Sequence, residues 1–211
     1  MENLFLSVLD KKRMNLLKKV GFLKNYGFYL AGGTALALQI GHRTSLDFVF
    51  YTQKKFDPTR IREVFDKRFK LVRDIHVAEG TLILDVEGIE LSFFNYPYKL
   101  IKPCLKLEEV ILASMEDIAA MKILAISQRG RRRDFIDIYF LIHKYGLKKI
   151  MEFTKEKYSM FNIYVGFQGL TYFNDADEDL EKKRFRLFKK VNWDRIKNYI
   201  IKEVNKVRFQ L

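Results

Sequence analysis

A pair of glycines at positions 32 and 33 is the sharpest chemical signal in the sequence. The segment Phe28–Ala31 is predicted to be a strand, and Gly32-Gly33-Thr34 then opens a short helix that ends near Ile40. The first N–H groups of a helix lack partners within it, and the helix dipole is positive there, so this turn favours an anion such as phosphate. Thr34 would add a hydroxyl donor. A tight turn in which glycine permits close packing fits the same residues, so both interpretations stay open.

Asp47 is the first acidic residue after this turn. The alternation over Ser45–Tyr51 predicts a strand with two faces. One face carries Ser45, Asp47, Val49 and Tyr51, and the other, predicted to be core, carries Leu46, Phe48 and Phe50. A carboxylate oxygen is a ligand that Mg²⁺ prefers. A solvated strand residue or an ion-pair partner is the alternative interpretation of Asp47.

Cations and acids follow on two predicted helices in the second half of the chain. Lys122 and Arg129 lie seven residues apart on a helix predicted from Ser114 to about Gln128, so they face the same way. A lysine with a buried stem and an arginine that complements the helix dipole would explain both without a ligand. Asp134 and Asp137 begin the next predicted helix, where helix capping and pairing with arginine are the simpler roles.

The elements that must position these residues fall into two regions. Up to residue 103, strands are predicted at 28–31, 45–51, 71–77, 81–86 and 89–95, with helices at 4–23, 32–40 and 57–69. Beyond Lys106 nearly everything has helical periodicity, with helices predicted at 114–128, 133–145, 147–158, 161–173 and 192–209. The turn signals between Pro97 and Pro103 predict two domains, 1–103 and 104–211, in an α+β protein.

Composition excludes several classes of protein. The 211 residues include 39 Lys+Arg and 26 Asp+Glu, for a net charge of +13, and 48% hydrophobic residues, which is typical of a globular chain. Cys104 is the single cysteine, so no intramolecular disulfide can form. No stretch approaches the roughly 20 apolar residues that a transmembrane helix needs, and residues 4–9 are too short for a signal sequence. A cytoplasmic location away from membranes is therefore expected.

The positive charge is concentrated at the C-terminus. Residues 181–211 hold eleven Lys and Arg against three acids, and residues 129–133 hold four more arginines. Such density favours a polyanion such as RNA, although a solvated basic face is the alternative. Tyr172 and Phe173 are predicted to pack in the interior rather than to stack on bases.

Three stretches of sequence, in this order, resemble the AbiEii/AbiGii-type abortive-infection nucleotidyltransferase toxins, relatives of the DNA polymerase beta-like nucleotidyltransferases. They are Gly32–Thr34 with Ser45–Phe48, Lys122–Ile126 with Arg129–Asp137, and Leu170–Ala176. The resemblance covers most of the chain. It implies a nucleotidyltransferase-like mixed sheet with flanking helices, followed by a C-terminal helical bundle.

The resemblance also implies a reaction, namely metal-dependent transfer of a nucleoside monophosphate from an NTP to an acceptor such as tRNA, and an antitoxin as partner protein. The implied catalytic residues are Asp47, Lys122 and Asp134, with Asp47 also holding Mg²⁺ and Asp134 either orienting an arginine or acting as general base. The implied nucleotide-binding residues are Gly32, Gly33, Thr34, Ser45, Arg129 and Arg133.

Val49 departs from the pattern of these transferases, which continue the first motif as Asp-x-Asp. Two acids at positions i and i+2 of a strand can share metal ions, whereas a valine supplies no ligand. Two hypotheses follow. Either the chain works with one metal held by Asp47 and the phosphates of the nucleotide, or it is a degenerate member that binds nucleotide, nucleic acid or a partner protein without transfer.

Overall fold

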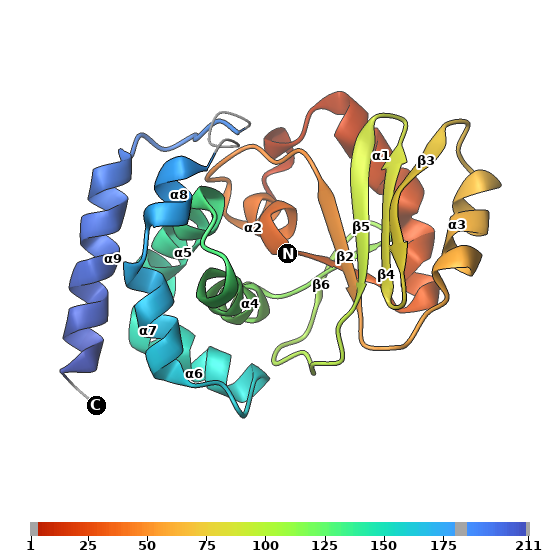
Figure 1. Cartoon of the computed structure of the whole chain (residues 1–211). Helices are drawn as coiled ribbons and strands as arrows, with labels where there is room; N and C mark the ends of the chain where they lie inside the picture. The colour runs from red at the N-terminus through yellow and green to blue at the C-terminus, as the bar shows by residue number, and fades with distance from the viewer. Residues whose placement is uncertain (1–3, 180–184, 210–211) are drawn as a thin grey trace.

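The computed structural model describes residues 4–179 and 185–209 of the chain, and a seven-stranded mixed sheet runs through its centre (Figure 1). The strand order is β3-β4-β5-β2-β1-β7-β6. The strands are β1 (Tyr29–Ala31), β2 (Phe48–Thr52), β3 (Val72–Ala78), β4 (Thr81–Val86), β5 (Ile89–Asn95), β6 (Leu105–Leu107) and β7 (Val110–Leu112). The strands predicted over residues 28–95 are all present, within a few residues of their expected bounds.

Strand β2 lies at the middle of the sheet and carries the first functional motif. It pairs antiparallel with β1 and parallel with β5, so that Val49 lies opposite Ala31 on one side and Ser92 on the other. The strand begins at Phe48, three residues later than predicted, so Ser45 and Asp47 precede the ladder. Asp47 is thus held by a connecting segment at the start of β2 rather than by the sheet itself.

The alternation of β2 divides its side chains between two layers. Phe48 and Phe50 are buried on the side covered by α3 (Pro58–Asp66), where Phe93 of β5 packs against Phe65 of that helix with ring centroids 5.5 Å apart. Val49 faces the opposite side, toward α4 (Met115–Gln128). The predicted core position is therefore confirmed for Phe48 and Phe50, whereas Leu46 precedes the strand and is half-buried. The other face of the strand is available to a site.

Helices α4 to α9 gather on one side of the sheet and α1 and α3 lie on the other, and α9 is the helix farthest from the sheet (Figure 1). The helices are α1 (Lys11–Lys19), α2 (Gly32–Ile40), α3 (Pro58–Asp66), α4 (Met115–Gln128), α5 (Arg132–Tyr145), α6 (Leu147–Lys157), α7 (Ile163–Thr171), α8 (Asn174–Glu178) and α9 (Trp193–Arg208). The helices predicted from residue 114 onward are confirmed to within two residues at each end. None of the helices in the described ranges is long and apolar enough to cross a membrane.

The single helix predicted over residues 4–23 is wrong, because three short helical pieces occupy this region. Turns of 3-10 helix at Leu6–Val8 and Val20–Tyr26 flank α1. The Asp10 carboxylate accepts a hydrogen bond from the Arg13 amide and so starts a new helix there. Gly27, with φ of +76°, ends the second 3-10 turn and directs the chain into β1.

The expectation of only helices beyond Lys106 is also wrong, since β6 and β7 form one edge of the sheet. Each strand has three residues, too few for an alternating pattern to stand out in sequence. Leu112 of β7 pairs parallel with Leu30 of β1, so the sheet continues past residue 103. The division into domains 1–103 and 104–211 stays a prediction.

The chain returns to the first motif after residue 184. The Thr44 amide donates to the Arg186 carbonyl over 2.9 Å, and the Phe188 amide donates to the His42 carbonyl over 2.9 Å. Helix α9 follows and buries Ile196, Ile200, Val204 and Val207 along one face. Lys182, Lys183 and Arg184, part of the predicted basic cluster, lie outside the described residues.

Candidate functional site

The nine residues that the family resemblance implied for the site all line one pocket between the sheet and the helices. These residues are Gly32, Gly33, Thr34, Ser45, Asp47, Lys122, Arg129, Arg133 and Asp134. Arg43, Val49 and Tyr51 also line it. Four separate parts of the sequence therefore meet here, namely the start of α2, the start of β2, the face of α4 and the first turn of α5.

The glycine turn forms one wall of the pocket. Gly32 has φ of +67°, a left-handed conformation that glycine adopts without strain, and α2 begins at this residue. A Cβ atom at Gly33 would overlap the Arg43 guanidinium. Ala31, which precedes α2, has no side chain that can cap the helix, so the first N–H groups of α2 lack a capping hydrogen bond. The close packing that the sequence left as one interpretation is therefore present, and the anion-binding interpretation of this turn stays a prediction.

Thr34 and Ser45 fix the position of Asp47. The Thr34 hydroxyl donates to the Asp47 carbonyl. The Ser45 hydroxyl lies 2.6 Å from the Thr34 hydroxyl and donates to it, because the one proton of Thr34 is already used. Both hydroxyl protons are used within the protein. The Asp47 carboxylate remains 31% exposed, with Arg133 Nη1 at 3.7 Å.

Asp137 lies behind the pocket and gathers the basic residues around it. His42 Nε2 lies 2.7 Å from its carboxylate, Arg43 donates two hydrogen bonds of 2.7 and 2.9 Å, and Lys122 Nζ lies at 2.6 Å. Asp137 and His42 have no exposed side-chain surface. Lys122 also donates to Asp134 over 2.6 Å, so it is a buried ion-paired residue rather than one whose ammonium reaches solvent.

The charges in this cluster hold one another in the ionised state. Burial by itself would raise the pKa of Asp137, but Arg43 and Lys122 hold it well below its usual value. Burial would lower the pKa of Lys122, and Asp134 and Asp137 raise it instead. Burial lowers the pKa of His42, more than Asp137 offsets, so the imidazole is neutral and donates Nε2–H. Nδ1 of His42 has no hydrogen-bond partner in the described part of the chain.

Sequence reasoning assigned Asp137 a role with arginine but missed its place at the centre of this cluster. The pairing of His42 and Arg43 with Asp137 was also missed, because Asp137 lies 94 or more residues away along the chain. The signal available was the spacing of Asp134 and Asp137, three residues apart and so on one face of α5.

The pocket offers a metal ion one accessible carboxylate. Val49 lines the pocket where a second acid would act as a ligand, and Ser92 lies directly across from it on β5. Glu90 is exposed and does not line the pocket, and Asp134 is paired with Lys122. The described residues contain no group of three or more His, Cys, Asp or Glu side chains that could hold a metal. Asp47 alone fits an Mg²⁺ whose other ligands are substrate phosphates and water.

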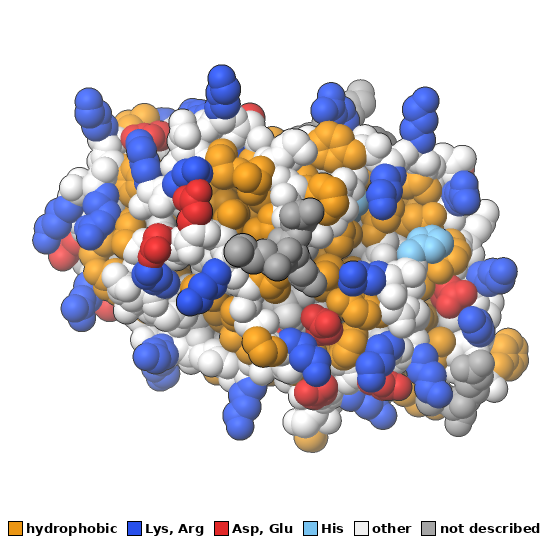
Figure 2. Space-filling view, turned by 180° about the vertical axis from the view of Figure 1, so that it is seen from behind, with side chains coloured by type: hydrophobic (Ala, Val, Ile, Leu, Met, Phe, Trp, Pro, Cys, Tyr) orange, Lys and Arg blue, Asp and Glu red, His pale blue; other side chains and the backbone are white. Residues whose placement is uncertain are grey.

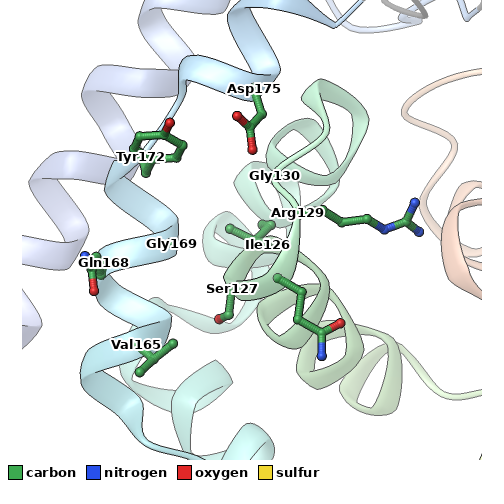
Figure 3. Close-up of a pocket in the computed structure, with 10 residues that line it drawn as sticks. Ile126, Ser127, Arg129, Gly130, Val165, Gln168, Gly169, Tyr172 and Asp175 are labelled. Carbon is green, nitrogen blue, oxygen red and sulfur yellow. The ribbon is translucent and has the colours of Figure 1, made fainter.

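A second pocket adjoins the first at Arg129 (Figure 3). Its lining includes Gln168 of α7, Tyr172 directly after the end of that helix, and Asp175 of α8. Phe173 is buried as predicted and packs against Phe135, with ring centroids 4.8 Å apart. The prediction of an interior position is wrong for Tyr172, which is 51% exposed, because its ring points away from the core at the end of α7.

Comparison with known proteins gives concordant results. A family model described as nucleotidyl transferase AbiEii toxin, Type IV TA system, matches residues 16–210. The uncharacterized protein aq_aa25 of Aquifex aeolicus is 40% identical over 179 residues, covering 82% of this chain and 86% of that protein.

Two solved structures share the fold. JHP933 from Helicobacter pylori is 17% identical with a TM-score of 0.61, covering 96% of this chain and 94% of that one. The nucleotidyltransferase toxin MenT4 from Mycobacterium tuberculosis is 11% identical with a TM-score of 0.52, covering 90% of this chain and 80% of that one. The predicted α+β, nucleotidyltransferase-like fold is confirmed.

Proposed function

Since this chain belongs to the AbiEii nucleotidyl transferase toxin family, we propose that it transfers a nucleoside monophosphate from an NTP to an acceptor such as tRNA in an Mg²⁺-dependent reaction. The observation that carries the proposal is the meeting of the glycine turn, Asp47 and several cations in one pocket. Because the family is one of toxin–antitoxin systems, an antitoxin protein is the proposed partner.

The reaction we propose is a displacement at the α-phosphorus of the NTP. A hydroxyl oxygen of the acceptor forms a bond to that phosphorus, the bond to the bridging oxygen breaks, and pyrophosphate leaves. Such reactions depend mainly on positioning the groups and on neutralising the phosphate charge. The proton of the acceptor hydroxyl passes to a base, for which Asp134 is the proposed residue because it lines the pocket.

The basic residues of the pocket are the proposed partners of the triphosphate. Arg129 and Arg133 can pair with phosphate through two N–H groups each, whereas the Lys122 ammonium, ion-paired with Asp134 and Asp137, acts as a buried point charge at the wall of the pocket. The N–H groups of the Gly32-Gly33 turn would add donors at the start of α2. Asp47 is the residue that would hold Mg²⁺, and the metal ion would supply neutralisation of phosphate charge.

The proposal is tested with purified protein, Mg²⁺, total RNA and each of the four labelled NTPs. Transfer of label to RNA is the expected result, and Asp47→Asn should reduce the rate at least about 100-fold. Glu90→Gln is the matched control, because Glu90 is an exposed acid on β5 outside the pocket and its loss should leave transfer unchanged. The proposal is wrong if neither RNA nor the protein itself becomes labelled with any NTP.

A degenerate member that binds without transfer is the second candidate, and Val49 in the pocket is the observation that favours it. Val49→Asp separates the two. If the wild-type chain transfers, the added acid should lower the Mg²⁺ concentration needed for half the maximal rate roughly ten-fold. If the wild type is inactive and Val49→Asp creates transfer, the natural chain is a binding protein.

A further inference from the structure

The second pocket is a groove between the last turn of α4 and helix α7, and it runs up to the start of α8 (Figure 3). Arg129 lines both this groove and the pocket that holds Asp47. In Figure 3 the Arg129 side chain extends away from Tyr172 and Asp175, while its backbone stays beside the groove. A ligand in the groove would therefore adjoin one in the catalytic pocket, with Arg129 between the two.

The floor of the groove is built from closely packed backbone. A Cβ atom at Gly169 of α7 would lie 3.0 Å from the Ser127 Cα and 3.1 Å from the Ile126 carbonyl oxygen of α4. At Gly130 a Cβ atom would meet the Phe135 ring at 2.8 Å. Gly169 allows α7 to approach α4 closely, and Gly130 makes room for the Phe135 ring. Polar and aromatic side chains then line the groove over this packed backbone.

The side chains along the groove carry the groups that recognise a nucleoside. Tyr172 offers a half-exposed aromatic ring on which a base can stack. The Gln168 amide can both donate and accept hydrogen bonds, and the Asp175 carboxylate can accept them from amino groups of a base or from ribose hydroxyls. Arg129 supplies a cation for phosphate at the boundary with the catalytic pocket.

We propose that this groove binds the terminal nucleotides of a single-stranded RNA acceptor, with one base stacked on Tyr172. This inference rests on the proposed function, because it is the acceptor that must bring a hydroxyl to the catalytic pocket. Continuity with that pocket through Arg129 favours RNA over a protein segment as the occupant. The NTP base is the other nucleoside available, and the experiment below separates the two.

The test measures binding, so it does not depend on catalysis. Fluorescence anisotropy of a labelled single-stranded RNA of about ten nucleotides gives the Kd of the wild type and of each variant. Tyr172→Ala should raise that Kd about ten-fold, and Tyr172→Phe should keep it near the wild-type value. Tyr164→Ala is the matched control, because Tyr164 is a 60% exposed tyrosine on the same helix that does not line the groove.

Nucleotide affinity is measured in parallel with a fluorescent NTP analogue. It should be the same in Tyr172→Ala and in the wild type, and a loss of NTP affinity alone would make the groove a base pocket for the NTP and overturn the inference. Equal effects of Tyr164→Ala and Tyr172→Ala, or no effect of either, would also overturn it. If transfer is never detected but Tyr172→Ala weakens RNA binding selectively, the proposed function fails and this RNA site stands.

Discussion

Asp137 accepts hydrogen bonds from His42 and Arg43 and forms an ion pair with Lys122, and its side chain is fully buried. Taking these charges out of water costs several kcal/mol per ion, so the cluster is stable only while each charge keeps its partner. The cluster contributes to the site by holding two cations in position. Lys122 and Arg43 both line the pocket that holds Asp47, and Asp137 fixes both of them from behind.

His42 makes the stability of the cluster depend on pH. Burial lowers the pKa of His42, so as the pH falls below 6.5 the unfolded chain takes up a proton that the folded chain does not. The contribution of His42 to stability is therefore fully present above the unfolded pKa and is lost as the pH falls toward the folded one. We expect the free energy of unfolding to drop by about 1 kcal/mol between about pH 7.5 and 5.5.

Urea denaturation across this pH range checks the prediction. His42→Gln should flatten the dependence, because a Gln side-chain amide can still donate to Asp137 but does not titrate. His143→Gln is the control, since His143 also has a lowered pKa but is stacked on Tyr199 and far less buried. If the pH dependence of the unfolding free energy survives in His42→Gln and disappears in His143→Gln, then His143 rather than His42 causes it, and the prediction is wrong.

At the scale of elements, the sequence located the pieces of the site because each piece depends on local rules. The start of α2 at Gly32 and the Ser114 cap of α4 follow from glycine conformation and from hydroxyl capping, which need only neighbouring residues. Strands β6 and β7 were missed because pairing with β1, rather than local pattern, determines them. The Asp137 cluster was missed for the same reason, since its members come from distant segments.

A buried ion pair fixes helix α4 to helix α6 and to the segment that leads toward β6. Lys157 Nζ lies 2.6 Å from Asp117 and donates to the Lys99 carbonyl over 2.9 Å, and both side chains are fully buried. Asp117 also accepts from the amides of Ile101 and Lys102 and from the Ser114 hydroxyl. This network holds the segment before β6 against α4, the helix that carries Lys122 and Arg129.

Asp117→Asn should destabilise the fold by about 3–5 kcal/mol, because it leaves the Lys157 ammonium buried without a counter-ion. The free energy of unfolding from urea denaturation measures the effect. Lys149→Met is the matched control, since the Lys149–Glu152 pair is more than half exposed and its removal should change stability little. A similar loss of unfolding free energy in the two variants would contradict the prediction, because it would mean that a buried ion pair and an exposed one contribute equally to stability.

At the scale of the whole molecule, the basic residues that give the charge of +13 extend well beyond the pocket that holds Asp47. Figure 2 shows lysines and arginines over much of one face, with fewer acidic side chains among them. In the described residues 185–209 the basic side chains outnumber Asp194 and Glu203, the acids there. Helix α9 lies on the far side of α7 from α4, so its charges lie beyond the proposed acceptor groove (Figure 1).

This arrangement predicts a division of RNA binding between a groove for the end of the chain and a basic surface for its body. Replacing the exposed Arg195, Lys202 and Lys206 of α9 by Gln should weaken binding of a full-length tRNA and lower its salt dependence. Each lost phosphate contact reduces the slope of log K against log salt by about 0.9 for a duplex, so the slope should fall by as much as about 3. A single-stranded RNA of about ten nucleotides, confined to the groove, should bind the variant as it binds the wild type.

The control removes the same number of charges from a distant element. Lys11, Lys12 and Lys19 are exposed on α1, which lies at the opposite side of the molecule from α9 (Figure 1). Replacing these three lysines by Gln lowers the net charge equally but should leave the salt dependence of tRNA binding close to that of the wild type. If the slope of log K against log salt is the same in the α1 and α9 variants, overall charge alone attracts the RNA. RNA that lies across α9 should instead lower the slope in the α9 variant only.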